Sequence, residues 1–151
     1  MNANASNQGG GRSKTPLHLW IVGVLALLWN LVGAFDYLAT QLELESYMSQ
    51  FNQEQLDFFY GFPKWVTSAW AIAVWGSVVG TVGLLLRRKW AVWAFGASLL
   101  GMAITTIHNF LLTNGAEVMG SAGSMFTIVI WVVAIFLFVY ARRQAAAGVI
   151  T

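Results

Sequence analysis

Four long apolar runs alternate with short polar stretches along the chain. The runs cover residues 17–40, 63–86, 90–112 and 122–141. About 20 helical residues cross a hydrocarbon core of about 30 Å, and each run is at least that long. Because a backbone inside a bilayer must satisfy its own amides, the runs are expected to be helices. The pattern predicts an all-α integral membrane protein, with residues 17–141 forming a four-helix bundle.

The polar ends are expected to lie outside the bilayer. Residues 1–16 are rich in Asn, Ser and Gly, a composition typical of a flexible tail, and residues 142–151 are expected to form a C-terminal tail. The tripeptide Val32-Gly33-Ala34 resembles a signal-peptide cleavage site. The apolar run before it is longer than a usual signal sequence, so a membrane span is the preferred interpretation.

A short amphipathic helix is predicted between the first two spans, on the outer surface of the membrane. Asn52 can cap it and Gln55 completes a capping box, with Phe51 and Leu56 placed as a hydrophobic staple. The expected helix covers Gln53–Tyr60. It is either a connector that tucks its apolar side towards the bundle or a surface that docks a partner.

Small residues recur at spacings of three and four in the first three spans, a spacing that allows close helix approach in lipid. The second span contains Ala69, Ala73, Gly76, Gly80 and Gly83, the third contains Ala94, Ser98, Gly101, Thr105 and His108, and the first contains Gly23, Ala26, Asn30 and Gly33. These stripes are predicted to pack helices within one bundle. A dimer face is the alternative.

Composition supports a bilayer as the solvent. Apolar residues make up 58% of the chain and charged residues 9%, whereas soluble domains average about 45–50% and about 25%. The net charge of +2 and the absence of a basic stripe argue against nucleic acid as a partner. The chain has no cysteine, which excludes disulfides and thiolate metal sites.

Basic residues are distributed unevenly among the polar segments. One group lies in the N-terminal tail, the loop between the second and third spans, and the C-terminus: Arg12, Lys14, Arg87, Arg88, Lys89, Arg142 and Arg143. Lys64 is the one basic residue on the opposite side, where all six acids fall. The positive-inside rule therefore predicts that both termini are cytoplasmic.

A few polar side chains near the ends of the spans are candidates for a shared pocket. They are His108, Asp36, Asn30, Thr67, Ser68 and Asn109. Ionisable groups inside a membrane are costly, so a pair formed by His108 and Asp36 would be a functional candidate. Both residues lie near the outer boundary, where side chains can reach water, and an interfacial role is the alternative.

No nucleophile motif, phosphate loop or metal-ligand cluster occurs in the sequence. We therefore expect a protein that is not an enzyme and that has no cofactor and no metal site.

Several stretches resemble a family of small, uncharacterised bacterial inner-membrane proteins that often carry the label "sugar transporter". The stretches are LHLWIVGVLALLWNLVGAFDYLATQ, YMSQFNQEQLDFFYGFPKWV, AWAIAVWGSVVGTVGLLLRRKWAVWAFGASLLG and FTIVIWVVAIFLFVYA, and they cover most of residues 17–141. The resemblance implies a bacterial inner-membrane location. It assigns no residue to a substrate.

Two functions fit these observations. The first is transport of a small polar solute, sugar-like by resemblance only, by an oligomer, because one four-helix chain has little room for a site between repeats. The second is an accessory or assembly subunit of a larger membrane complex. A polar cavity that reaches past Asn30 would favour transport, and a filled bundle would favour the subunit.

Overall fold

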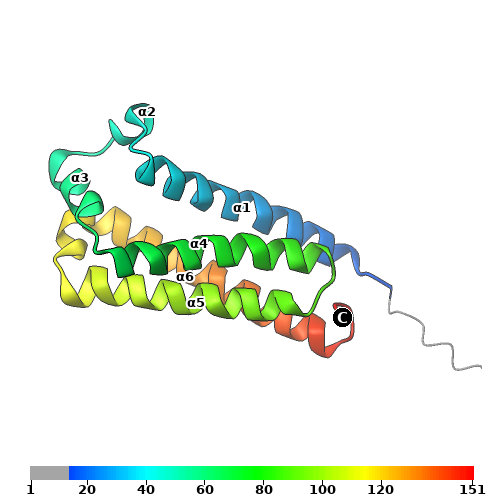
Figure 1. Cartoon of the computed structure of the whole chain (residues 1–151). Helices are drawn as coiled ribbons and strands as arrows, with labels where there is room; N and C mark the ends of the chain where they lie inside the picture. The colour runs from blue at the N-terminus through cyan, green and yellow to red at the C-terminus, as the bar shows by residue number, and fades with distance from the viewer. Residues whose placement is uncertain (1–13) are drawn as a thin grey trace, which may run out of the picture.

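The computed structural model describes residues 14–151, so most of the predicted N-terminal tail lies outside the described residues. Four long helices form a bundle: α1 (Leu17–Gln41), α4 (Lys64–Leu85), α5 (Trp90–Ile107) and α6 (Gly115–Ala146) (Figure 1). Each is long and apolar enough to cross a membrane, α5 together with the π-helical turn that continues it to Leu112. The prediction of an all-α, four-helix membrane protein is confirmed.

The bundle has two different ends. One end, here the terminal end, holds the start of α1, the turn between α4 and α5, and the C-terminus. The other, the loop end, holds two short helices, α2 (Glu45–Met48) and α3 (Gln53–Tyr60), and the π-helical turn η1 (His108–Leu112). Helix α3 has the predicted bounds and the predicted capping box between Asn52 and Gln55. Helix α2 was not predicted.

Helices α4 and α5 are antiparallel and approach each other closely through their small residues. A Cβ atom at Gly101 would lie 2.5 Å from the backbone oxygen of Ala69 and 2.8 Å from the backbone nitrogen of Ala73. The Ser98 hydroxyl donates a 2.5 Å hydrogen bond to the Ala73 carbonyl across the same interface. The backbones can approach this closely only because these positions lack bulky side chains.

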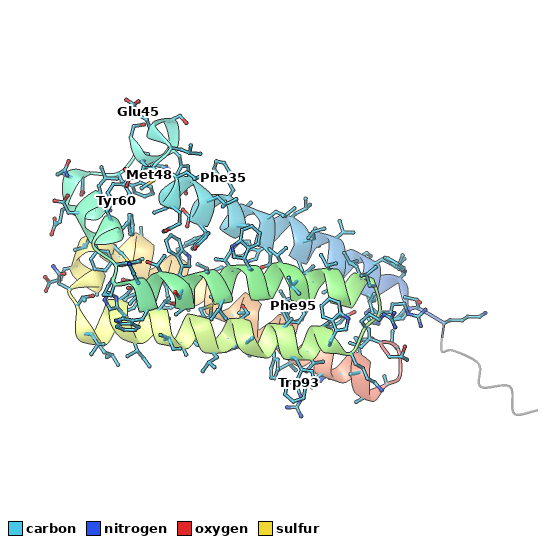
Figure 2. The ribbon with its side chains drawn as sticks, viewed as in Figure 1. Phe35, Glu45, Met48, Tyr60, Trp93 and Phe95 are labelled. Atoms are coloured by element: carbon cyan, nitrogen blue, oxygen red, sulfur yellow. The ribbon has the colours of Figure 1, made fainter. Side chains whose placement is uncertain are left out.

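The three glycines of α4 face α5. A Cβ atom at Gly76 would lie 3.1 Å from the Ala94 carbonyl oxygen. Gly80 and Gly83 receive aromatic rings, with Cβ positions 2.8 Å from Phe95 and 2.6 Å from Trp90. Phe95 is 2% exposed within the bundle, whereas Trp93, two residues earlier, is 82% exposed and points away from it (Figure 2).

Helix α1 lies close to α4 at the terminal end, and towards the loop end large side chains bridge the two helices, with the Tyr37 ring 5.0 Å from that of Trp70. At the terminal end Gly23 meets Leu85, and a Cβ atom would lie 2.4 Å from the leucine side chain. Towards the loop end the two helices diverge (Figure 1). A Cβ atom at Gly33 would meet nothing within 4 Å. The prediction that Gly33 packs against a helix is therefore wrong, because its face of α1 borders open space, whereas Asn30 and Tyr37 on the neighbouring turns contact α4.

The best-packed core lies at the terminal end. It includes Leu19, Leu84, Leu137 and Ile150, all at most 2% exposed. Thr151 lies against the turn between α4 and α5. Its carbonyl accepts a hydrogen bond from Lys89 N at 3.1 Å, and its N–H donates one to Arg87 O at 2.9 Å. Residues 142–151, predicted as a tail, therefore consist of the end of α6 followed by a packed segment.

Helix α6 is longer than the predicted span of residues 122–141, since it covers Gly115–Ala146. It bends at Gly120, whose φ of 70° lies in the left-handed region that favours glycine. Of the residues in its most apolar 18-residue window, 6% are buried by the rest of the chain. Nearly all of its outer face is therefore available to lipid.

Candidate functional site

A cavity of about 500 Å³ lies inside the bundle. We call it the central cavity. It extends from Phe95 and Leu137, towards the terminal end, past Asn30 to Tyr47 and Gln55 at the loop end. Helices α1, α4, α5 and α6 all contribute to its wall, and α2 and α3 contribute to it at the loop end. The cavity occupies the space left where α1 diverges from α4.

The wall of the central cavity is mainly apolar. Most hydroxyl groups on it are bonded to the backbone of their own helix: Ser77 donates to Val74 O at 2.7 Å, Thr106 to Met102 O at 2.7 Å, and Thr127 to Gly123 O at 3.0 Å. These donors are satisfied without a ligand, and they leave methyl and methylene groups as much of the surface. The wall therefore favours an apolar body.

Asp36 is the one charged residue on the wall of the central cavity, which carries no Lys, Arg or His. Its Oδ1 accepts a 2.5 Å hydrogen bond from the Tyr47 hydroxyl. Within residues 14–151, no side chain or backbone group donates to its Oδ2. Burial and, after it, the bond to Asp36 raise the pKa of Tyr47 to about 12, so its hydroxyl remains a donor at neutral pH.

Asn30 is deeper in the bundle and joins α1 to α4. Its Nδ2 donates to Thr81 Oγ1 at 2.8 Å and to Ser77 O at 3.3 Å. Asn30 is 7% exposed and Thr81 is fully buried. A side-chain hydrogen bond between membrane helices contributes about 0.6 kcal/mol on average. Asn30 therefore has a structural role, although it also lines the cavity.

Three of the six predicted pocket residues line the central cavity: Asn30, Asp36 and Asn109. Thr67 and Ser68 instead line a second hollow of about 420 Å³ at the loop end, together with Glu43 and Lys64. Both of their hydroxyls donate to the carbonyl four residues earlier, Pro63 O at 3.4 Å and Lys64 O at 2.8 Å. The prediction of one pocket shared by all six residues is wrong.

His108 is not paired with Asp36. Its ring is packed edge-on against Phe62 and Trp65, with centroids 5.5 and 5.4 Å away. Its Nδ1 lies 3.0 Å from Asn109 Oδ1. In the described part of the chain no hydrogen bond or ion pair links His108 to Asp36, and the predicted pair is wrong.

The wide turn η1 accounts for the different surroundings of His108 and Asn109. A π-helical turn holds more residues than an α-helical one and changes the direction of those that follow. The Thr113 hydroxyl bonds to His108 O at 2.9 Å and supports the widened turn. His108 remains on the side that faces α4, while Asn109 and Phe110 reach the central cavity. Asn109 is one of the predicted pocket residues that does line a cavity.

Aromatic residues at the loop end separate the two hollows. Thr40, Phe59 and Phe62 line both of them. The rings of Phe59 and Phe62 lie 6.3 Å apart, and Phe51 contacts Phe59 at 5.3 Å. Sequence patterns did not identify this partition or Tyr47. The aromatic content of residues 47–62 was a signal that these residues cover something apolar.

The described residues hold no group of three His, Cys, Asp or Glu side chains that is suited to a metal ion. One carboxylate, hydrogen-bonded to the Tyr47 hydroxyl, thus lies in an apolar, aromatic wall, an arrangement suited to binding a small molecule. Comparison of the chain with protein-family models, curated proteins and solved structures found no match.

Proposed function

We propose that this chain binds a small amphipathic molecule in the central cavity as a step in moving that molecule at the bacterial inner membrane. The observation that carries the proposal is the cavity itself, about 500 Å³ in size and reaching past Asn30 into the bundle. Known small-molecule sites have volumes of about 300–1,000 Å³, with mainly apolar walls and few polar groups. An accessory subunit with a filled bundle would lack such a space.

The apolar wall of the central cavity argues against a sugar as the ligand. A sugar would place several hydroxyls against apolar side chains, and each unpaired polar group would cost about 1–3 kcal/mol. Carboxylate and amide side chains on the wall are few: Asn30 is deep in the bundle, and Asp36, Gln55 and Asn109 lie near the loop end. A molecule with one polar head and an apolar body therefore fits better than the sugar-like solute expected from the resemblance.

The proposed orientation places both termini in the cytoplasm. Arg87, Arg88 and Lys89 in the turn between α4 and α5, and Arg142 and Arg143 at the end of α6, belong to the terminal end. Cytoplasmic loops carry such an excess of basic residues. Reporter fusions at the C-terminus and within residues 49–52 test the orientation, since only the first should be active with a cytoplasmic reporter.

Thermal unfolding with a set of probes tests the binding function. 3-Phenylpropanol, 3-phenylpropylamine and 3-phenylpropanoate share one apolar body and differ in the head group. A ligand that binds only the folded state raises the unfolding temperature. At least one probe should raise the midpoint of the purified wild-type protein.

Gly33 provides matched variants for this experiment. A side chain there meets nothing within 4 Å, so Gly33→Leu should project into the cavity without disturbing the bundle. Gly33→Ala adds one methyl group and leaves most of the space open. The shift should persist in Gly33→Ala and be lost in Gly33→Leu. No shift with any probe, or equal shifts in both variants, would contradict the proposed function.

A further inference from the structure

We propose that the ligand of the central cavity is an organic cation, an amine or quaternary ammonium with an apolar body, whose charge lies against Asp36. This inference rests on the proposed function and adds the chemical class of the ligand. Its basis is the charge on the cavity wall, the aromatic rings around it, the free space beside Asp36 and the charge of the loop end.

The charge of Asp36 has no counter-charge on the cavity wall. Asp36 is the one charged residue there, and the wall carries no basic side chain. Tyr47 occupies Oδ1 alone, so the second carboxylate oxygen is available to a ligand. A carboxylate within a membrane span is costly unless it is paired. A cationic ligand supplies the missing partner, whereas an anionic ligand would be repelled.

The cavity wall is also rich in aromatic rings. It includes Trp29, Tyr47, Phe62, Trp70, Phe110 and Trp131. The face of an aromatic ring attracts a cation, and several rings together form the cages that bind quaternary ammonium groups. Among these rings, Tyr47 touches the carboxylate directly through its hydroxyl. An aromatic wall next to one carboxylate thus attracts a cation both through the carboxylate charge and through cation–π interactions. A neutral molecule gains neither of these two interactions.

The space beside Asp36 suits a charged head with an apolar body. Trp29, Gly33 and Asp36 are spaced four and three residues apart, so they lie on one face of α1. Gly33, one turn below the carboxylate, leaves that face open. Below it, the Trp29 ring lies 6.0 Å from that of Phe126 on α6. A ligand with its head at Asp36 can lay its body along Gly33 towards these rings.

The loop end is strongly acidic, which favours the approach of a cation. It holds all six acidic residues of the chain: Asp36, Glu43, Glu45, Glu54, Asp57 and Glu117. Lys64 is the one basic residue there. A surface of one sign raises the local concentration of ions of the opposite sign and speeds their association. The second hollow, lined by both Glu43 and Lys64, lies on the loop-end side of the Phe59–Phe62 partition.

A pair of probes that differ only in charge tests the inference. Benzyltrimethylammonium and its uncharged carbon analogue neopentylbenzene have the same shape. Their binding to the full chain in lipid nanodiscs is measured by equilibrium dialysis, with empty nanodiscs subtracted. The cation should bind at least about tenfold more tightly than the neutral analogue, a preference that corresponds to about 1.4 kcal/mol.

Substitution at Asp36 supplies the control. Asp36→Asn keeps the shape of the side chain and should remove the preference for the cation. Asp36→Glu keeps the charge and should retain most of the preference for the cation. This variant distinguishes the loss of a charge from the misfolding of the chain. Equal binding of both probes to the wild type, or a preference that survives in Asp36→Asn, would overturn the cation proposal.

The two proposals fail in different ways. Binding of the neutral analogue as tight as that of the cation, and lost in Gly33→Leu, supports a cavity ligand and overturns its cationic class. If neither probe binds the wild type and no phenylpropyl probe raises its unfolding temperature, the proposed function fails together with the inference. A preference for the cation that Gly33→Leu leaves unchanged would place the site outside the central cavity and overturn both.

Discussion

The interface between α4 and α5 and the space beside α1 are lined by the same kinds of small residue, yet one is closed and the other is open. At Gly101 an added Cβ atom would lie 2.5 Å from the Ala69 carbonyl oxygen, whereas at Gly33 it would meet nothing within 4 Å. A small residue permits close approach but does not bring a neighbour to it. In this bundle α4 uses its glycines for packing, and the open space beside Gly33 forms part of the central cavity.

The largest difference in the free energy of unfolding is expected between Gly101→Ala and Gly33→Ala, which each add one methyl group. Gly101→Ala should lower the free energy of unfolding by about 1–3 kcal/mol, because it forces apart two backbones in contact. Gly33→Ala should leave stability unchanged or raise it by up to about 1 kcal/mol, because alanine favours the helix. Unfolding in mixed micelles with increasing dodecyl sulfate measures both. Similar losses in the two variants would mean that α1 is packed at Gly33.

A smaller effect is expected where α1 does contact α4. Asn30 and Thr81 share a 2.8 Å hydrogen bond on the closed part of that interface. A double-mutant cycle with Asn30→Leu and Thr81→Val should give a coupling energy of about 0.6 kcal/mol. Additive effects of the two substitutions would show that this bond does not hold α1 to α4.

The smallest effect is expected between His108 and Asp36. The two side chains have different surroundings: His108 packs against the Trp65 ring of α4, and Asp36 lies on the cavity wall. In a cycle with His108→Leu and Asp36→Asn the changes in unfolding free energy should add within about 0.3–0.5 kcal/mol. A larger coupling energy would show that the two side chains interact, as the sequence had suggested.

The parts of the fold that depend on local sequence could be predicted. Four spans follow from apolar runs of sufficient length, and α3 follows from Asn52 and Gln55. The interface of α4 with α5 follows from small residues on two consecutive spans, which a four-residue segment, Leu86–Lys89, joins.

The candidate site depends on how separate elements are placed, and the sequence predicts it only in part. Asn30 and Asp36 were named from their position in a span, but the cavity exists because α1 diverges from α4, and no repeat spacing reveals that angle. The partner of Asp36 is Tyr47 on α2, a helix too short to recognise from periodicity. The wide turn at His108 then gave that residue and Asn109 surroundings that an α-helical count does not predict.

The open space inside this bundle can be tested directly, because the chain has no cysteine of its own. Ser77→Cys places a thiol on the cavity wall, and Val79→Cys places one on the same helix at a position that is 47% exposed and outside the cavity wall. In lipid nanodiscs a water-borne methanethiosulfonate reagent needs a thiolate, which hydrocarbon suppresses. Ser77→Cys should react readily and Val79→Cys slowly. A thiol at residue 77 as unreactive as the one at residue 79 would contradict the cavity.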